Sequence, residues 1–163
     1  LNLHHKVFAR IVTFGKGLGA HGAAILGSET LKEFIINFTR SFIYTTAIAP
    51  HSVATISSAY QELVHTSAIK KLQQNITYFQ QQVEDLDLKD AFIASDSAIQ
   101  SCIIPGNEQV KTIAEKLQQQ HYLVKPILSP TVAKGEERLR FCLHSYNLKE
   151  EIFSVLQCLK REL

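Results

Sequence analysis

Methionine is absent from this chain of 163 residues, and cysteine occurs only three times, as Cys102, Cys142 and Cys158. An odd number of cysteines without paired spacing supports neither a disulfide framework nor a zinc site. We therefore expect the three thiols to be buried as small apolar side chains, which suits a reducing cytoplasm. The chain starts at Leu1 and shows no signal-peptide pattern, so a piece of a longer cytoplasmic protein is the simplest interpretation.

Long apolar runs and a strong net charge are also missing. The net charge is +2 and the basic residues form no run, so charge gives no support for binding to nucleic acid or to an anionic membrane. Apolar stretches such as 23–26 are far too short to cross a bilayer, and a soluble protein is expected. Hydrophobic residues nevertheless make up 45% of the chain, which is enough for a packed core.

The first part of the chain predicts two strands followed by two helices. β-Branched and aromatic residues make 7–14 a strand, and a second short strand covers 23–26 after a glycine-rich stretch. Ser28 caps a helix whose apolar positions recur three and four residues apart, at Leu31, Phe34, Ile35 and Phe38. Residues 42–46 are predicted to be extended. Pro50 then begins a second helix with apolar positions Val53, Ile56, Tyr60 and Leu63.

The remainder alternates strands with helices. Ser67 caps a helix with an apolar stripe at Ile69, Leu72, Ile76, Phe79 and Val83. Strands are predicted at 91–95, 98–104, 122–128 and 138–144, the first two turning at Asp96-Ser97. Asn107 caps a helix with Val110, Ile113, Ala114 and Leu117 inward, and Asn147 with Glu150 begins a last helix that buries Ile152, Leu156 and Leu159. This order predicts an α/β fold that ends in a small α/β sandwich, a sheet with helices on one face, after a boundary near residue 66.

The glycine-rich segment from Thr13 to Gly22 is the most informative part of the chain. Its glycines match the dinucleotide fingerprint G-x-G-x-x-G, but that motif needs a helix where this sequence predicts a second strand. Lys16 also lacks the frame of a phosphate-binding loop. Two interpretations remain: a hairpin with a solvated lysine, or a lysine whose unencumbered backbone lets its amine meet a flat aldehyde cofactor. The second requires loss of the lysine proton, which burial and neighbouring positive charge promote.

Three motifs together resemble the α-oxoamine synthases, which are fold-type-I pyridoxal-phosphate enzymes. They are T-F-G-K-G-x-G-x-x-G-A-A at 13–24, F-I-Y-T-T-A-I-A-P at 42–50, and S-P-T-V with a later R-L-R within 129–140. The family joins an amino acid to an acyl thioester, on coenzyme A or an acyl carrier protein, with loss of carbon dioxide. The G-A-A element favours the branch that uses L-alanine and a pimeloyl thioester over branches that use glycine or serine. The resemblance implies that 1–66 is the tail of the large cofactor domain and 67–163 the small carboxy-terminal domain.

The resemblance also implies roles for five residues. Lys16 would carry pyridoxal 5'-phosphate as a Schiff base and move protons at the amino-acid α-carbon. Thr13 would contact the cofactor phosphate, and Thr45 and Thr46 would reach the phosphate of the neighbouring subunit, which implies a homodimer with shared sites. Thr131 would contact substrate. Ordinary strand-end or turn threonines are the alternative interpretation of these positions.

One position departs from the family pattern. The family has a carboxylate-binding arginine where this chain has Leu128, and an apolar side chain cannot clamp a carboxylate. Lys125 and Arg140 are conceivable substitutes, although the alternation of the last strand is equally consistent with a structural Arg140. Residues 1–12 contain no aspartate to hold the pyridinium nitrogen, so we expect these 163 residues alone to be inactive. A non-enzymatic α/β interaction domain, with the glycine loop as a plain hairpin, remains the alternative.

Overall fold

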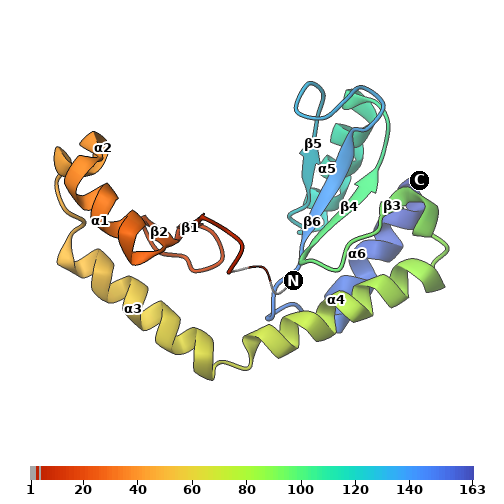
Figure 1. The fold of residues 1–163 in the computed structure, drawn as a ribbon. Helices are drawn as coiled ribbons and strands as arrows, with labels where there is room; N and C mark the ends of the chain where they lie inside the picture. Colours follow the sequence, from red (N-terminus) through yellow and green to blue (C-terminus); the bar gives the residue numbers. More distant parts are fainter. Residues whose placement is uncertain (1–2, 4) are drawn as a thin grey trace. The chain divides into compact units, whose positions relative to one another are not determined.

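The computed structural model describes residue 3 and residues 5–163, and the chain divides into two compact units, Leu1–Thr66 and Ser67–Leu163. The first unit starts with an antiparallel hairpin of β1 (Ala9–Thr13) and β2 (Ala23–Gly27), in which Thr13 lies opposite Ala23 (Figure 1). Three helices follow: α1 (Glu29–Phe38), α2 (Arg40–Ile43) and α3 (Pro50–His65). Both predicted strands and both predicted helices of this unit are therefore present. The predicted cap is confirmed too, because the Ser28 hydroxyl accepts from the Leu31 N–H at 3.2 Å.

The predicted extended segment at 42–46 is wrong. α2 ends at Ile43, and the Tyr44 N–H still donates to the Arg40 carbonyl, as a helical turn requires. The Thr45 hydroxyl then donates to the Ser41 carbonyl at 2.5 Å, four residues back, and so closes the turn by a local hydrogen bond. β-Branched and aromatic composition indicated a strand here, but no strand among the residues that the structure describes pairs with it.

The first unit buries little of its own apolar surface. Within its described residues, only Phe14 and Ala20 are buried hydrophobic residues. The apolar positions that predicted α1 and α3 are open instead, with Phe38 69% exposed and Val53 48% exposed. The helical periodicity is real, but the surface that these stripes would pack against is not supplied by this unit.

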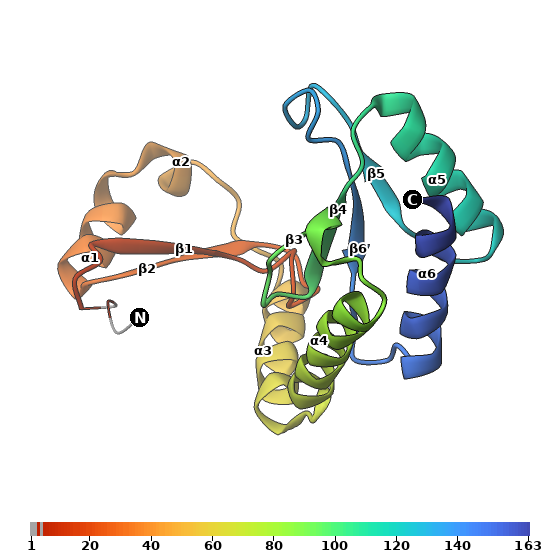
Figure 2. The same ribbon diagram turned by 90° about the vertical axis from the view of Figure 1, so that its right-hand side faces the viewer.

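The second unit is a two-layer α/β sandwich, as predicted. Its elements are α4 (Ala68–Asp85), the 3-10 turn η1 (Lys89–Ala91), β3 (Phe92–Ile93), β4 (Ile99–Ile103), α5 (Asn107–Gln119), β5 (Lys125–Ile127), β6 (Arg138–Cys142) and α6 (Lys149–Glu162). The strands form one antiparallel sheet in the order β3-β4-β6-β5. α5 and α6 lie on the same side of this sheet (Figure 2). The four strands predicted at 91–95, 98–104, 122–128 and 138–144 exist but are shorter than the sequence indicated.

Alternation along β6 separates the two faces of the sheet. Leu139 and Phe141 are buried under the helices, whereas Arg140 and Cys142 are exposed on the open face. The helices meet this core with the positions that periodicity predicted, and the buried ones are Ile76, Phe79, Val83, Val110, Ile113, Ala114, Leu117, Ile152, Leu156 and Leu159. Ile69 of the predicted α4 stripe is exposed.

The cysteine prediction is correct for Cys102 and wrong for Cys142. Cys102 is fully buried, and burial raises the pKa of its thiol to about 12. Cys142 follows the outward phase of β6 and is exposed, while Cys158 is half-buried. None of the three forms a disulfide.

Two predicted helix starts use different residues. Asn107 is the first residue of α5 and its side chain bonds elsewhere, with Gly106 as the cap. Asn147 caps no helix; its side-chain oxygen accepts from the His144 N–H at 2.7 Å. α6 begins after Leu148, whose N–H donates to the Glu151 carboxylate at 2.9 Å, so the acid of the capping pair is Glu151.

Candidate functional site

The loop between β1 and β2 holds Lys16 at the tip of a tight turn. Inside the loop, the Phe14 N–H donates to the Gly22 carbonyl and the Ala20 N–H to the Phe14 carbonyl, both at 2.9 Å. The Gly19 N–H donates to the Lys16 carbonyl at 3.0 Å and closes the turn. The ring of Phe14 is buried beside Tyr60, edge to face at 6.3 Å between centroids. These contacts fix the backbone on both sides of the lysine.

The glycines of this loop differ in what the fold demands of them. Gly22 has φ +117°, and a Cβ there would stand 2.9 Å from a methyl of Ile48, so glycine is required by the backbone. A Cβ at Gly17 would meet nothing within 4 Å, and its φ lies outside the left-handed region. The fold of the hairpin therefore does not require Gly17, and the space beside Lys16 is left open.

The Lys16 side chain is exposed and has no hydrogen bond or ion pair among the residues that the structure describes. Its amine is thus available to a ligand. The first unit leaves this side chain unburied. The open space at Gly17 and the available amine fit an aldehyde cofactor bound at this loop.

The three candidate threonines of the first unit, Thr13, Thr45 and Thr46, differ in availability. Thr13 ends β1, is exposed, and donates to no described residue through its hydroxyl. Thr46 is exposed in the irregular segment between α2 and α3 and is likewise unbonded within the described chain. The Thr45 hydroxyl donates to Ser41 and keeps only its lone pairs for another partner.

In the second unit, Thr131 lies in the loop that joins β5 to β6. It is exposed, and its hydroxyl has no partner among the described residues. Leu128, at the start of the same loop, is half-buried and packs against the hydrophobic core. Leu128 is therefore a core residue, and it cannot take over the role of a carboxylate-binding arginine.

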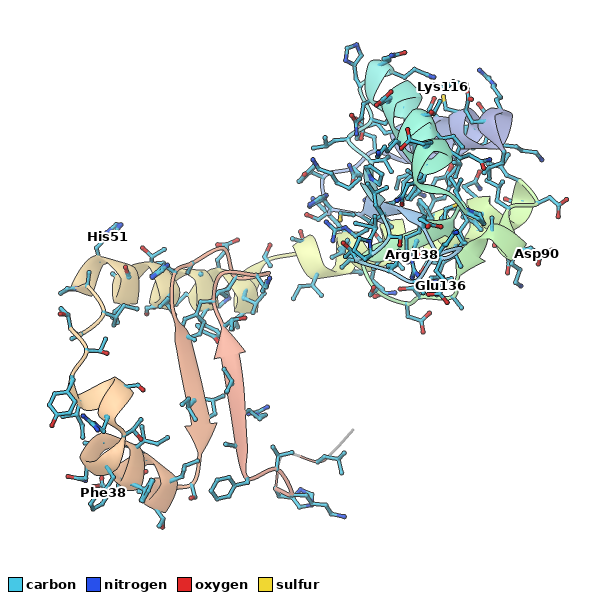
Figure 3. The ribbon with its side chains drawn as sticks, turned by 90° about the horizontal axis from the view of Figure 1, so that it is seen from above. Phe38, His51, Asp90, Lys116, Glu136 and Arg138 are labelled. Atoms are coloured by element: carbon cyan, nitrogen blue, oxygen red, sulfur yellow. The ribbon has the colours of Figure 1, made fainter. Side chains whose placement is uncertain are left out.

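The two arginines of the R-L-R motif have different surroundings. Arg138 donates from Nε to the Glu136 carbonyl at 2.9 Å and from Nη2 to the Glu136 carboxylate at 3.3 Å (Figure 3). Arg140 lies directly opposite Lys125 across β5 and β6. Neither Lys125 nor Arg140 has an ion pair within residue 3 and residues 5–163. Like charges directly across a ladder are unfavourable, so the pair suits an anion brought by a ligand.

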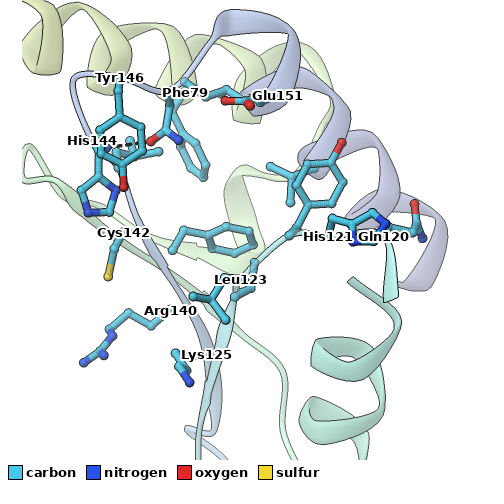
Figure 4. A pocket seen from close by; sticks show the side chains of 17 residues that line it. Phe79, Gln120, His121, Leu123, Lys125, Arg140, Cys142, His144, Tyr146 and Glu151 are labelled. Carbon is cyan, nitrogen blue, oxygen red and sulfur yellow. Dashed lines mark hydrogen bonds between the residues drawn. The ribbon is translucent and has the colours of Figure 1, made fainter. Parts of the chain in front are cut away.

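Lys125 and Arg140 line one end of an open cleft in the second unit (Figure 4). The cleft has an apolar floor that includes Phe79, Phe141 and Ile152. The carboxylate of Glu151, which also lines it, is already bonded to the Leu148 N–H. The cleft therefore combines apolar surface with two cations that no carboxylate of the described residues neutralises.

The described residues contain no group of three or more histidine, cysteine, aspartate or glutamate side chains placed to hold a metal ion. None of their helices is long and apolar enough to cross a membrane.

Comparison with known proteins identifies the class. The model of the aminotransferase class I and II family matches residues 3–156, and the chain belongs to this family. Curated relatives include 8-amino-7-oxononanoate synthase of Emericella nidulans, which is 37% identical over 96% of this chain, and that of Photorhabdus laumondii, which is 35% identical over 91%. This chain covers 39% of the length of each relative.

Solved structures agree with this assignment. The crystal structure of 8-amino-7-oxononanoate synthase from Francisella tularensis superimposes on 95% of this chain with a TM-score of 0.82 and 28% identity, and 45% of that protein is covered. A serine palmitoyltransferase of Sphingomonas wittichii shares the fold, with a TM-score of 0.83 at 20% identity over 98% of this chain and 40% of that one. The resemblance to α-oxoamine synthases and the predicted fold class are thereby confirmed.

Proposed function

We propose that this chain is the carboxy-terminal part of a pyridoxal-phosphate-dependent synthase that condenses L-alanine with a pimeloyl thioester, giving 8-amino-7-oxononanoate and releasing carbon dioxide and the free thiol of the acyl carrier. The observation that carries the proposal is Lys16, held at the tip of a fixed hairpin beside space that the chain does not fill. The names of the relatives support the same choice of reaction. In this proposal Leu1–Thr66 belongs to the large cofactor domain and Ser67–Leu163 is the small domain.

The residues of the first unit would hold the cofactor. The Lys16 amine binds its aldehyde, and the Thr13 hydroxyl donates to its phosphate. Thr46 reaches the phosphate bound by the neighbouring subunit of a cytoplasmic homodimer, and Thr45 joins it once its hydroxyl proton turns away from the Ser41 carbonyl. When bound, the cofactor ring acts as an electron sink for the bonds of the amino-acid α-carbon. The released Lys16 amine then takes a proton from that carbon and returns one to it.

The residues of the second unit would hold the substrate. The Thr131 hydroxyl has no partner within the described chain and is available for a hydrogen bond to substrate. Arg140 and Lys125 supply the positive charge for a substrate carboxylate that Leu128 cannot bind. Arg138 does not share this role, because Glu136 already accepts its hydrogen bonds.

Chemical trapping and product analysis test the proposal in the full-length protein. Borohydride reduction followed by peptide mass spectrometry should place the reduced cofactor on Lys16. L-Alanine with a pimeloyl thioester should then give 8-amino-7-oxononanoate and carbon dioxide in equal amounts. Cofactor on another lysine would contradict the assignment of the site.

A second candidate function is another α-oxoamine synthase, which uses glycine or serine with a different acyl thioester. Leu128 stands where the family has a carboxylate-binding arginine, and it packs against the core. This difference in the carboxylate site supports the second candidate. Turnover with glycine or serine and none with L-alanine would select this candidate. A non-enzymatic interaction domain would instead leave the full-length protein without the trapped cofactor.

A further inference from the structure

The segment 128–137, which carries Thr131, is tied to the turn before α5 at two points. The first tie is the Asn107 amide. Its Oδ1 accepts from the Ser129 N–H at 3.0 Å, and its Nδ2 donates to the Ser129 carbonyl at 3.3 Å. One side chain therefore bonds both backbone groups of a single residue, much as a neighbouring strand would, two residues before Thr131.

The second tie is the Glu137 carboxylate, on the other side of Thr131. Glu137 is 2% exposed, and its Oε2 accepts from the Gly106 N–H and the Gly135 N–H, both at 2.9 Å. Its carbonyl also accepts from the Ile104 N–H at 2.8 Å. These backbone donors lower the pKa of the Glu137 carboxyl, with Lys134 acting in the same direction.

The two ties involve neighbouring residues at the start of α5: Asn107 makes the first, and its cap Gly106 makes the second. They hold the loop by hydrogen bonds at Ser129 and at Gly135, which lie on either side of Thr131 in the chain. The Thr131 hydroxyl itself is bonded to no described residue. The loop backbone is thus fixed on both sides of Thr131, while the Thr131 hydroxyl is left available.

We infer that Asn107 and Glu137 are positioning residues that hold Thr131 in place for the substrate of the synthase. The inference rests on the proposed function and adds two residues to it. Neither side chain would touch substrate. Each acts through the loop backbone, so its loss should weaken substrate binding more than it slows the bond-forming step.

A double-mutant cycle in the full-length protein tests the inference. Asn107→Ala should raise the KM of the substrate that Thr131 contacts by about fivefold to tenfold, with little change in kcat, as expected for one or two lost hydrogen bonds. Thr131→Val, which removes only the hydroxyl, should have a similar effect. In the Thr131→Val background, Asn107→Ala should add less than about twofold, because it acts through a hydroxyl that is already gone.

Asn75→Ala is the matched control. The Asn75 amide is buried and donates to the His144 and Asn147 carbonyls, so it ties a different loop, away from Thr131. Asn75→Ala should leave the KM of each of the two substrates unchanged. Asn107→Asp keeps the acceptor for the Ser129 N–H, so its KM should lie between those of the unmodified protein and Asn107→Ala. Additive effects of Asn107→Ala and Thr131→Val would overturn the inference.

Hydrogen exchange measured by mass spectrometry separates this inference from the proposed function. Asn107→Ala and Glu137→Ala should speed the exchange of amides within 128–137, and Asn75→Ala should not. Unchanged exchange in that segment would overturn the positioning role, whatever the enzyme does. Absence of turnover in the unmodified protein would contradict the proposed function and leave the exchange measurement to decide on the two ties.

Discussion

Two arginines only two residues apart on β6 show how differently side chains of one motif can be placed. Both point to the open face of the sheet, because their alternation with Leu139 directs them away from the helices. Arg138 is engaged by the Glu136 carbonyl and carboxylate, and Arg140 faces Lys125 without a counter-charge in the described chain. The sequence left open whether Arg140 is structural. Its surroundings favour ligand binding.

Replacing Arg140 by alanine should therefore raise the KM of the substrate whose carboxylate Arg140 binds. The expected increase is about 10- to 100-fold, the effect of one lost charged hydrogen bond or ion pair. Arg138→Ala is the control and should change that KM less than about fivefold, because an exposed pair contributes little. Steady-state kinetics of the full-length protein make the comparison. Equal effects of the two substitutions would show that charge on this face acts generally and not through Arg140.

The strongest effect at the scale of single residues is expected at Lys16. Lys16→Ala should lower kcat by at least about a thousandfold, since in the proposed function one side chain is both the proton carrier and the covalent anchor of the cofactor. Lys32→Ala is a matched control, because Lys32 is an exposed lysine of the same unit whose amine is bonded to Glu29. Turnover that survives Lys16→Ala would show that the chemistry does not need Lys16, and the glycine loop would then be the plain hairpin of the interaction-domain alternative.

Among the elements, those with a strong period and a core of their own were predictable from sequence. α5 buries the four residues that its pattern indicated, because the sheet supplies the surface they need. The 42–46 segment was mispredicted because its composition indicates a strand that finds no partner. Asn107 was assigned as a helix cap because that is what asparagine does locally, and only the fold brings Ser129 within its reach. No sequence signal identifies Glu137 as a buried carboxylate, since its donors come from two separate turns.

The hairpin of the first unit gives a prediction that contrasts two glycines. Gly22→Ala should destabilise the full-length protein by about 1–3 kcal/mol, the usual cost of a strained backbone conformation, with the clash at Ile48 adding to it. Gly17→Ala should change the free energy of unfolding by less than about 0.5 kcal/mol. Thermal unfolding of the two variants without cofactor checks this. If the open space beside Lys16 receives the cofactor, Gly17→Ala should weaken cofactor binding while leaving the melting temperature of the cofactor-free protein unchanged.

The loop between β5 and β6 should loosen in acid. The pKa of the Glu137 carboxyl in the folded state lies below its ordinary value of 4.5, so the stabilisation from its hydrogen bonds is complete above that value and is lost as pH falls through the lowered pKa. Glu137→Gln should be less stable than the unmodified protein at pH 7. The difference in melting temperature between the two should shrink steadily below about pH 4.5. A difference that is constant down to pH 2 would show that the charge of Glu137 does not contribute.

On the scale of the whole chain, the two units bury their apolar residues very differently. Every residue of the main hydrophobic cluster, from Ile76 to Leu159, belongs to the second unit. The first unit has Phe14 and Ala20 as its buried hydrophobic residues among those described, and it exposes large side chains such as Phe8 and Phe38. Burial of apolar area is the main favourable contribution to folding, so the stability of the chain should reside in the second unit.

Residues 67–163 expressed alone should therefore unfold in one cooperative transition with urea, whereas residues 1–66 alone should show none. Leu117→Ala is the check on the first result. Leu117 is fully buried between α5 and the sheet, and its truncation should lower the free energy of unfolding of the isolated second unit by about 2–5 kcal/mol. Circular dichroism and tyrosine fluorescence should give the same urea midpoint for the isolated second unit, which has no tryptophan. A gradual transition, or one that Leu117→Ala does not shift, would mean that the second unit needs the rest of the protein to reach its native packing.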